Sequence, residues 1–396
     1  MPKIAPFHAI RYAAGTDLQA VIAPPYDVLS PVDVAELAGR DQHNIVHVDV
    51  PTGGEDRYQI AADTFRAWLA DGTLTVDDQP SLTIYRMSFV DATGAQRAIT
   101  GVLAGLEVVD VDAGGVLPHE RTTPKAVTDR LDLTRATAAN LSPVWGLSLA
   151  SGLTAALAAP GEPLGSMTTD GVVHQIERIS DPERIAAITA IIASDDVLIA
   201  DGHHRYAISR TYRDQVRTAT ASTQTEAEYT LTFINELVDD QLSIEAIHRV
   251  YTGITFAQLR AELSGCFTLE AAPSPTPATL AQMVQLGRLM LLAPDGTAEW
   301  LIPRPEAFVG VRHLDGAYLE HALATSSAEV GYQHGLTEMI ELVGSGTVTA
   351  GVLIRPTSLA EIQRTAREGL LMPPKSTFFT PKLRTGLVIR PTAPLA

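Results

Sequence analysis

The stretch VLIADGHHRYAISRTYRDQVR, residues 197–217, carries the strongest structural signal in the chain. Its apolar start, 197–200, is typical of a buried strand, and the segment that begins at His203 has the pattern of a helix. Asp201 and Gly202 lie between them, so backbone N–H groups without helical partners are expected at the helix start. The helix dipole and the missing side chain of Gly202 favour an approaching anion there. The stretch therefore predicts a strand, a turn and a helix that together bind phosphate.

The side chains that open this helix add hydrogen-bond donors suited to phosphate oxygens, namely His203, His204 and Arg205. A basic stripe continues at spacings of three and four residues, through Arg210, Arg213 and Arg217. An alternative is that Asp201 only caps the helix and that the two histidines bind loop carbonyls. A two-histidine zinc site is disfavoured, because adjacent helix residues point about 100° apart.

A second charged segment, residues 117–147, is predicted to be mainly helical up to Ala139, with Thr123 as the N-cap and Pro124 at the first position. Glu120 precedes this helix in a turn between a histidine and an arginine. The candidate site residues of the segment are His119, Glu120, Arg121, Lys125 and Arg130. The alternative for the helical part is a solvated face, on which Lys125 pairs with Asp129 and Asp132 lies nearby.

Two further segments contain candidate ligand-binding residues. PPYDV, residues 24–28, is a rigid turn after a predicted strand, and it presents Tyr26 and Asp27. MPPKSTFFTPKLRTGLVI, residues 372–389, contains the candidates Lys375, Ser376 and Thr377, and also Lys382. Its lysines either line an anionic pocket or are surface charges. A P-loop is excluded there, because the GxxxxGK frame and the following helix are missing.

Composition limits the classes of function. The 396 residues are 45% hydrophobic and 19% charged, and the formal net charge is 29 − 46 = −17. This charge disfavours nucleic acid and membrane surfaces as partners, so small-molecule substrates are expected, and a homodimer stays open. The one cysteine, Cys266, excludes an intramolecular disulfide and a four-thiolate zinc site, and its apolar context predicts a core position. We found neither a signal peptide nor a membrane-spanning stretch, which predicts a cytoplasmic protein.

The order of predicted elements indicates a mixed α/β, or α+β, fold. Three parts are expected: an N-terminal α/β part at 1–110, a core with the phosphate-binding turn at 111–252, and a C-terminal α/β domain at 253–396. The predicted strands are 18–23, 44–50, 82–90, 98–109, 197–200 and 348–354. The predicted helices are 31–37, 58–69, 181–193, 203–217, 318–324 and 359–368. Residues 151–171 are expected to form a loop or insertion, and 294–296 a hairpin turn.

Taken together, the strand, the sequence DGHHR and the basic helix resemble the signature of the ParB/sulfiredoxin-like superfamily. Within that superfamily, the turn looks similar to that of the free serine kinases. The combination of PPYDV, HERT, ADGHHRYA, PPKSTFF and TPKL also resembles a microbial family known as a domain of unknown function, over residues 6–389. The first resemblance implies a ParB/sulfiredoxin-like core that carries an N-terminal extension and an additional C-terminal domain.

The kinase resemblance implies phosphoryl transfer to the hydroxyl of free L-serine or a similar small hydroxy amino acid. Asp201 would be the catalytic carboxylate and Glu120 the candidate for a second one, with either able to help hold Mg²⁺. The donor would be inorganic pyrophosphate, ADP or ATP. The alternative is a nucleotide-binding regulatory module of the same superfamily that performs no catalysis. Specific DNA binding is disfavoured by the net charge.

Overall fold

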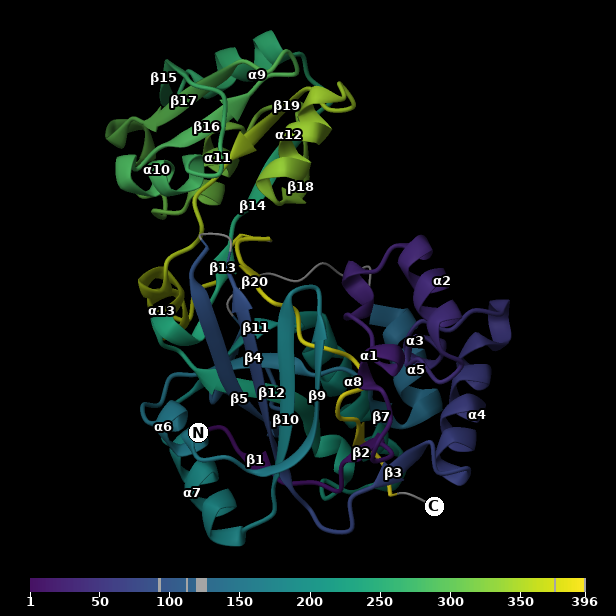
Figure 1. Cartoon of the computed structure of the whole chain (residues 1–396). Coiled ribbons are helices and arrows are strands. Elements are labelled where there is room, and N and C mark those ends of the chain that lie inside the picture. Colours follow the sequence, from purple (N-terminus) through teal and green to yellow (C-terminus); the bar gives the residue numbers. More distant parts are fainter. Residues whose placement is uncertain (92–93, 112, 119–126, 374, 395–396) are drawn as a thin grey trace. The chain divides into compact units, whose positions relative to one another are not determined.

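The computed structural model describes residues 1–91, 94–111, 113–118, 127–373 and 375–394 (Figure 1). This part of the chain divides into two compact units, each built of helices and sheets, which confirms the mixed α+β class. Unit 1 comprises residues 1–243 and 381–396, and unit 2 comprises residues 244–380. The chain leaves unit 1 after Ser243 and returns to it at Pro381. The three-part division with boundaries at 110 and 252 stays a prediction.

The centre of unit 1 is a sheet of nine strands among the described residues. In sheet order the strands are β6 (Val116–Pro118), β11 (Val197–Asp201), β8 (Val144–Ser148), β12 (Tyr229–Glu236), β5 (Gln96–Glu107), β4 (Leu82–Val90), β10 (Val172–Ile179) and β9 (Glu162–Thr169), and β1 (Ile4–Ala5) pairs with β5. Most pairs are antiparallel, but β11 runs parallel to β6, and β12 runs parallel to β8. β4 and β5 contain the predicted strands 82–90 and 98–109 and pair antiparallel, and their apolar residues contribute to the main core of the unit.

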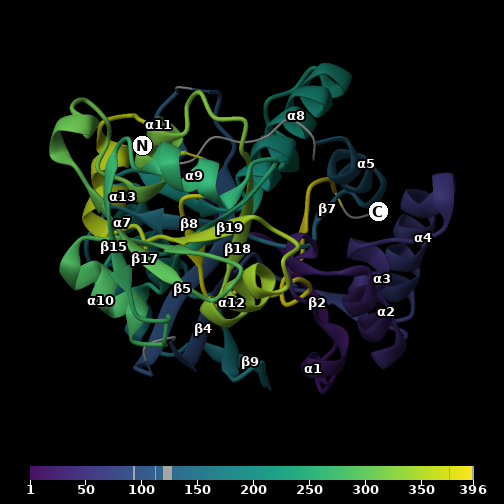
Figure 2. The ribbon, with the colours of Figure 1, turned by 90° about the horizontal axis from the view of Figure 1, so that it is seen from above.

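Helices surround this sheet. They are α1 (Leu18–Val21), α2 (Pro31–Arg40), α3 (Val46–Asp49), α4 (Arg57–Ala70), α5 (Val127–Thr137), α6 (Leu153–Ala158), α7 (Pro182–Ile192) and α8 (His203–Thr220), with 3-10 turns at Tyr26–Val28, Gly54–Asp56, Glu226–Glu228 and Asp239–Gln241. Seen from above, α8, α5, α4, α3 and α2 form a row in which each helix contacts the next (Figure 2). α6 and α7 pack together against the strands β5 and β1 (Figure 1).

Several elements begin and end where local sequence signals predict. The Ser30 side chain accepts a hydrogen bond from the Asp33 backbone N–H, and Asp33 returns one, so a complete capping box starts α2. Asp181 caps α7 in the same way through the N–H of Arg184. α4, predicted at 58–69, ends at Ala70 with Asp71 as its C-cap residue. α2, α4, α7 and α8 confirm the predicted helical segments, and the caps of α2 and α7 depend on residues only three positions apart.

The two short strands predicted in the N-terminal part are wrong. Residues 18–21 form α1, because Asp17 caps them through the N–H of Gln19 and Pro24 leaves no room for a longer strand. Residues 46–49 form α3, which starts where the Asn44 side chain accepts a hydrogen bond from the backbone N–H of Val46. Most residues of α3 are buried, so its apolar run reflects burial on several sides rather than a strand.

Two other segments also differ from the prediction. Residues 151–171, predicted to be a loop or insertion, contain α6 and the edge strand β9, which pairs with β10. Only one residue of β9 is buried, so its sequence has no alternating apolar pattern that would predict a strand. Residues 117 and 118 belong to β6 rather than to a helix, because they pair with β11. The described part of the predicted helix begins at Val127, and the proposed cap at Thr123 and Pro124 lies outside the described residues.

Unit 2 contains a second sheet of six strands within the described residues. In sheet order they are β15 (Phe267–Ala272), β17 (Ala298–Pro303), β16 (Leu289–Leu292), β19 (Ala350–Leu353), β14 (Ile247–Thr252) and β18 (Glu329–His334). Its helices are α9 (Phe256–Leu263), α10 (Thr279–Leu286), α11 (Asp315–Ala322), α12 (Leu336–Gly344) and α13 (Leu359–Arg367), with a 3-10 turn at Pro305–Phe308. The turn around 294–296 joins β16 to β17 as predicted.

The chain enters and leaves unit 2 through one short ladder, in which β13 (Ile244–Glu245) pairs with β20 (Phe378–Phe379). Residues 381–396 then complete unit 1, where β21 (Arg390–Pro391) pairs with β7 (Ala139–Asn140). The separate pair β2 (Ile10–Tyr12) and β3 (Leu74–Val76) is joined to this C-terminal segment, because Ile10 bridges to Ile389. None of the helices in the described ranges is long and apolar enough to cross a bilayer.

Candidate functional site

The turn between β11 and α8 has the geometry that the sequence predicts. Gly202 is the N-cap residue and adopts a left-handed conformation with φ of 83°. A Cβ at this position would lie only 3.0 Å from Nε of Arg205, so glycine allows the guanidinium to fold back over the turn. The first N–H groups of an 18-residue helix therefore face a position next to a fixed cation.

Asp201, the last residue of β11, is held by cationic groups from two distant segments. Its Oδ1 accepts a hydrogen bond from the Gly202 backbone N–H at 2.8 Å, and its Oδ2 accepts one from Nζ of Lys382 at 2.9 Å. Nη2 of Arg205 lies 3.9 Å from the same Oδ2. Burial alone would raise the pKa of Asp201, but the charges of Lys382 and Arg205 lower it well below its ordinary value. The carboxylate is thus ionised at neutral pH, and it does not act as the N-cap of α8.

Arg205 connects the turn to the PPYDV segment. Its Nη1 donates to the carbonyl oxygen of Pro143, while its Nε is buried without a hydrogen-bond partner among the described residues. Burial alone would lower the pKa of this guanidinium, but nearby Asp27 and Asp201 raise it. The charges of Arg205 also act on the Tyr26 hydroxyl, whose pKa is raised mainly by burial. Tyr26 and Asp27, which are candidate site residues from the sequence, therefore lie in the electrostatic environment of the turn.

A small cavity of about 50 Å³ lies beside Arg205. Its lining combines side chains from the 3-10 turn at Tyr26, from α3, from α5, from the loop before β8 and from α8, with Tyr26, Asp49, Arg130, Ser142 and Arg205 as its main polar members. Such a volume holds one or a few water-sized groups. The lining is mixed, since Leu133, Leu141 and Ile208 also contribute, but its charged members and Tyr26 offer hydrogen bonds to a small polar group.

Asp49 is a member of this cavity that the sequence reasoning missed. It is 3% exposed, and its Oδ1 accepts a hydrogen bond from Nη1 of Arg130 at 3.2 Å. Its Oδ2 has no hydrogen-bond partner among the described residues, and burial raises the pKa of this carboxyl. A lone carboxylate at the end of the apolar run 45–50 was the available signal, because a buried charge is costly unless it is paired.

Arg130, a predicted ligand-binding residue, is partly committed to structure. It donates to the backbone carbonyl and the carboxylate of Asp49, and its Nε donates to Oδ2 of Asp129 at 3.1 Å. Its guanidinium also lies 4.1 Å from the centre of the Tyr26 ring. Arg130 therefore fixes Tyr26 and Asp49 relative to each other while it lines the cavity. Asp129 itself accepts hydrogen bonds from Arg57 and Tyr58 of α4, and its expected partner Lys125 lies outside the described residues.

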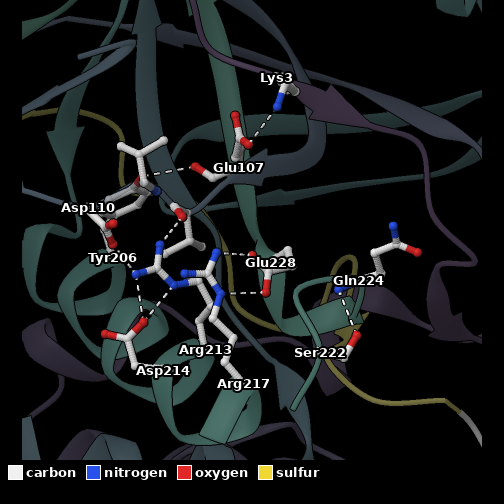
Figure 3. Close-up of polar contacts among 12 residues, drawn as sticks. Lys3, Glu107, Asp110, Tyr206, Arg213, Asp214, Arg217, Ser222, Gln224 and Glu228 are labelled. Atoms are coloured by element: carbon white, nitrogen blue, oxygen red, sulfur yellow. Dashed lines mark hydrogen bonds and ion pairs between the residues drawn. The ribbon is translucent and has the colours of Figure 1, made fainter. Parts of the chain in front are cut away.

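The arginine stripe along α8 serves the fold beyond its first turn (Figure 3). Arg213 is 1% exposed and forms ion pairs with Asp110 and with Asp214, at 2.7 Å for the latter. Arg217 pairs with Glu228 at 2.5 Å. These ion pairs neutralise the charges of the two arginines. Arg213 and Arg217 therefore do not extend the predicted anion site, although their spacing suggests that they would.

The remaining predicted site residues differ in where they lie. His203 and His204 are the first two residues of α8 and are half-buried. Lys375, Ser376 and Thr377 belong to unit 2, where the backbone carbonyl of Lys375 accepts a hydrogen bond from Arg249 at 3.1 Å. His119, Glu120, Arg121 and Lys125 lie outside the described residues.

The described residues offer no good Mg²⁺ site. In those ranges, no group of three or more histidine, cysteine, aspartate or glutamate side chains is arranged to hold a metal ion. Both oxygens of Asp201 are engaged by N–H donors, which an incoming cation would have to displace. We therefore derive no chemical step through a metal.

The comparisons with known proteins give a family and some distant structural likenesses. A family model described as protein of unknown function (DUF1015) matches residues 4–317. A comparison with curated proteins found no match. Among solved structures, a free serine kinase mutant in complex with AMP aligns at 11% identity and a TM-score of 0.40, covering 73% of this chain and 93% of that one.

Two further structures align at a similar level. SbnI with a C-terminal truncation, from Staphylococcus aureus, aligns at 14% identity and a TM-score of 0.38, covering 73% of this chain and 87% of that one. A conserved hypothetical protein from Pyrococcus furiosus aligns at 12% identity and a TM-score of 0.38, covering 70% and 92%. Likeness at this level establishes neither a shared fold nor a shared activity.

Proposed function

The chain belongs to the family described as protein of unknown function (DUF1015), and we propose that its unit 1 is a phosphotransferase. It would transfer a phosphoryl group from inorganic pyrophosphate or a nucleoside phosphate to the hydroxyl of free L-serine or a similar small hydroxy amino acid. One observation carries the proposal: the ionised Asp201 lies between Lys382 and Arg205 at the uncapped start of α8. The carboxylate of Asp201, which would bind the acceptor hydroxyl, thus lies next to the cations of Arg205 and Lys382, which would bind phosphate.

The donor phosphate would bind at the start of α8. The N–H groups of the first turn, the guanidinium of Arg205 and the ammonium of Lys382 are all donors. Phosphoryl transfer depends mainly on positioning and on neutralising charge at the phosphoryl oxygens, which these groups would supply. His203 and His204, as the first residues of the helix, are the proposed additional phosphate contacts.

Asp201 would accept the hydrogen bond of the acceptor hydroxyl. Its lowered pKa makes it a weak base in the resting state, so it orients the hydroxyl rather than removing its proton in advance. A phosphate that draws Lys382 away would leave Asp201 with less positive charge nearby and raise its basicity. Glu120 remains the proposed second carboxylate, and Mg²⁺ a proposed cofactor.

The cavity beside Arg205 supports the proposal that the phosphoryl acceptor is a small polar molecule. Its buried lining includes an acceptor, Oδ2 of Asp49, and a donor, Nε of Arg205, that have no hydrogen-bond partners among the described residues. Buried polar atoms of this kind are normally satisfied, so a ligand or water is expected to bind them. A phosphoryl acceptor with an ammonium and a carboxylate group could satisfy both atoms: the ammonium would donate to Oδ2 of Asp49, and the carboxylate would accept from Nε of Arg205.

The test is an assay for phosphoserine with L-serine and Mg²⁺, run separately with pyrophosphate, ADP and ATP. Asp201→Asn should lower turnover by about 100-fold or more, because a positioned carboxylate contributes on that order. Donor affinity should stay within a few-fold of the wild-type value, since the N–H groups and cations remain. Asp63→Asn, at an exposed position on α4, is the matched control and should leave turnover unchanged.

Each outcome has a distinct meaning. If the wild-type protein forms no phosphoserine with any of the three donors, serine kinase activity is refuted. If a donor nevertheless binds in calorimetry, unit 1 is instead the regulatory nucleotide-binding module named as the alternative. If Asp201→Asn retains full turnover, the catalytic role of Asp201 is wrong even though the activity stands.

A further inference from the structure

The carboxylate of Asp49 in unit 1 is only half satisfied by the fold. Asp49 is the last residue of α3 and is 3% exposed. Nη1 of Arg130 donates both to its backbone carbonyl and to its Oδ1, whereas Oδ2 has no hydrogen-bond partner among the described residues. A buried carboxylate oxygen without a donor is unfavourable, so a donor from outside these residues is expected at Oδ2.

The neighbouring cations are engaged in other directions. Nε of Arg130 donates to Asp129, and the guanidinium lies 4.1 Å from the centre of the Tyr26 ring. Nη1 of Arg205 donates to the carbonyl oxygen of Pro143. These contacts hold Arg130 at Oδ1, so we expect the donor for Oδ2 to come from the cavity that Asp49 lines.

The electrostatic surroundings of Asp49 favour a cationic donor over a water molecule. Burial raises the pKa of this carboxyl, which the charges of Arg130 and Arg205 lower. The charges of Asp27 and Asp129 raise it again. A positive charge at Oδ2 would stabilise the ionised carboxylate, and a hydrogen bond between two charged groups is stronger than one to water.

The cavity limits the size of that donor. Its volume of about 50 Å³ holds a few water-sized groups, such as an ammonium group and the carbon that carries it. Leu133, Leu141 and Ile208 also line the cavity and would contact this carbon. An ammonium group with methyl substituents would be larger and would offer fewer N–H donors. The cavity therefore fits an unsubstituted primary ammonium group.

We propose that Asp49 is a specificity-determining residue of unit 1, which selects ligands that carry a primary ammonium group. The inference rests on the proposed function, since it treats the cavity beside Arg205 as the binding site of the phosphoryl acceptor. It narrows the acceptors to hydroxy amino acids and related amino alcohols, and it excludes hydroxy acids without an amino group. Asp49 binds the acceptor and takes no part in the transfer of the phosphoryl group.

The test compares L-serine with L-glycerate, in which a hydroxyl group replaces the ammonium group. In calorimetry on the full chain, the wild type should bind L-serine about tenfold more tightly or better, because glycerate leaves the charge of Asp49 unpaired. Asp49→Asn retains the size of the side chain and an oxygen that accepts from Arg130, and it should lose most of this preference. Its affinity for pyrophosphate should stay within a few-fold of the wild-type value.

Asp63→Asn is the matched control, because Asp63 also pairs with an arginine, Arg66 at 2.7 Å, but lies on α4 outside the cavity lining. It should bind both compounds like the wild type. A second measurement needs no variant and applies even if Asp49→Asn does not fold. L-Serine should slow hydrogen exchange of the wild type in peptides that cover 45–50, whereas glycerate at the same concentration should not.

The outcomes separate the role of Asp49 from the proposed activity. If phosphoserine forms but Asp49→Asn retains the wild-type preference, or if L-serine leaves exchange at 45–50 unchanged, the role of Asp49 is refuted and the kinase activity stands. If Asp49→Asn abolishes the preference but no donor yields phosphoserine, Asp49 is confirmed as an ammonium-binding residue and the activity is refuted. Wild-type protein that binds L-serine no better than glycerate overturns the inference.

Discussion

Lys382 is the residue whose importance changes most between sequence and structure. It belongs to the segment in which Lys375, Ser376 and Thr377 are the predicted site residues. Among the lysines of this segment, Lys382 is the one that donates to the carboxylate of Asp201. The contact spans 181 positions in the sequence. Lys382 lowers the pKa of Asp201 and so keeps its carboxylate ionised, and it adds positive charge to the proposed phosphate site.

Replacement of Lys382 should therefore change both binding and titration. Lys382→Met should raise the pKa of Asp201 from its lowered value toward the ordinary 3.8, and should weaken pyrophosphate binding by about tenfold. The ion pair stabilises the folded state above pH 3.8, and this contribution is lost as pH falls through the lowered pKa. Calorimetry with pyrophosphate, and the acidic limb of the pH–rate profile, which should move to higher pH, provide the measurements.

Two further variants separate charge from shape at this position. Lys382→Arg should restore most of the affinity, because it retains the positive charge. Lys3→Met removes an exposed lysine that pairs with Glu107, and it should change neither property. If Lys382→Met binds pyrophosphate like Lys3→Met, Lys382 has only a structural role.

The strand β11, the turn and the helix α8 form the unit of structure that local sequence specifies best. Each part has a nearby signal: a short apolar run, a glycine with positive φ and a long helical pattern. The arginines further along α8 illustrate the limit of such signals. Their spacing is the same as that of a ligand-binding stripe, but Asp110 and Glu228 on other elements neutralise them (Figure 3).

Alanine at Gly202 tests the turn, and Gly72 provides a matched control. Both glycines have φ of 83°, but a Cβ at Gly72 would meet nothing within 4 Å, whereas one at Gly202 would meet Arg205. Gly72→Ala and Gly202→Ala should each lower the free energy of unfolding by about 1–2 kcal/mol through backbone strain. Only Gly202→Ala should also weaken pyrophosphate binding, measured by calorimetry. Equal affinities in the two variants would show that the turn does not bind the donor.

In the whole molecule, unit 1 is assembled from two stretches of chain that are separated by all of unit 2. The C-terminal stretch brings Lys382 to Asp201, bridges Ile389 to Ile10 and buries Arg390, which is 1% exposed. Unit 2 has its own hydrophobic clusters around two faces of its sheet. The two units therefore depend on the C-terminal stretch to different extents.

Removal of residues 381–396 should unfold unit 1 selectively. Loss of the buried Leu387, Val388 and Ile389 alone costs on the order of 5 kcal/mol, which approaches the total stability of many domains. Hydrogen exchange should show lost protection in β4 and β5 and retained protection in β16 and β19. Removal of residues 394–396 only is the control and should change neither. Retained protection of β4 and β5 in the shorter chain would contradict this division of stability.

The elements that could be predicted from the sequence have their causes within a few residues. The cap at Ser30, the strands β4 and β5, and the turn at Gly202 depend on hydrogen bonds, alternation and backbone freedom that neighbouring residues specify. The segments at 18–21 and 46–49 form short helices rather than the predicted strands, because a stretch as short as LQAV or VHVD is compatible with either conformation. Their conformation depends on Asp17 and Asn44 and on the surrounding core.

The candidate site shows the same division. Local sequence identified Asp201, Gly202 and Arg205, because the strand, the turn and the helix dipole predict an anion site without knowledge of the rest of the chain. Tertiary structure alone brought Asp49 and Lys382 to this turn, and it assigned residues 375–377 to the other unit. A contact between residues that are far apart in the chain depends on the path of every segment between them, and no local pattern records that path.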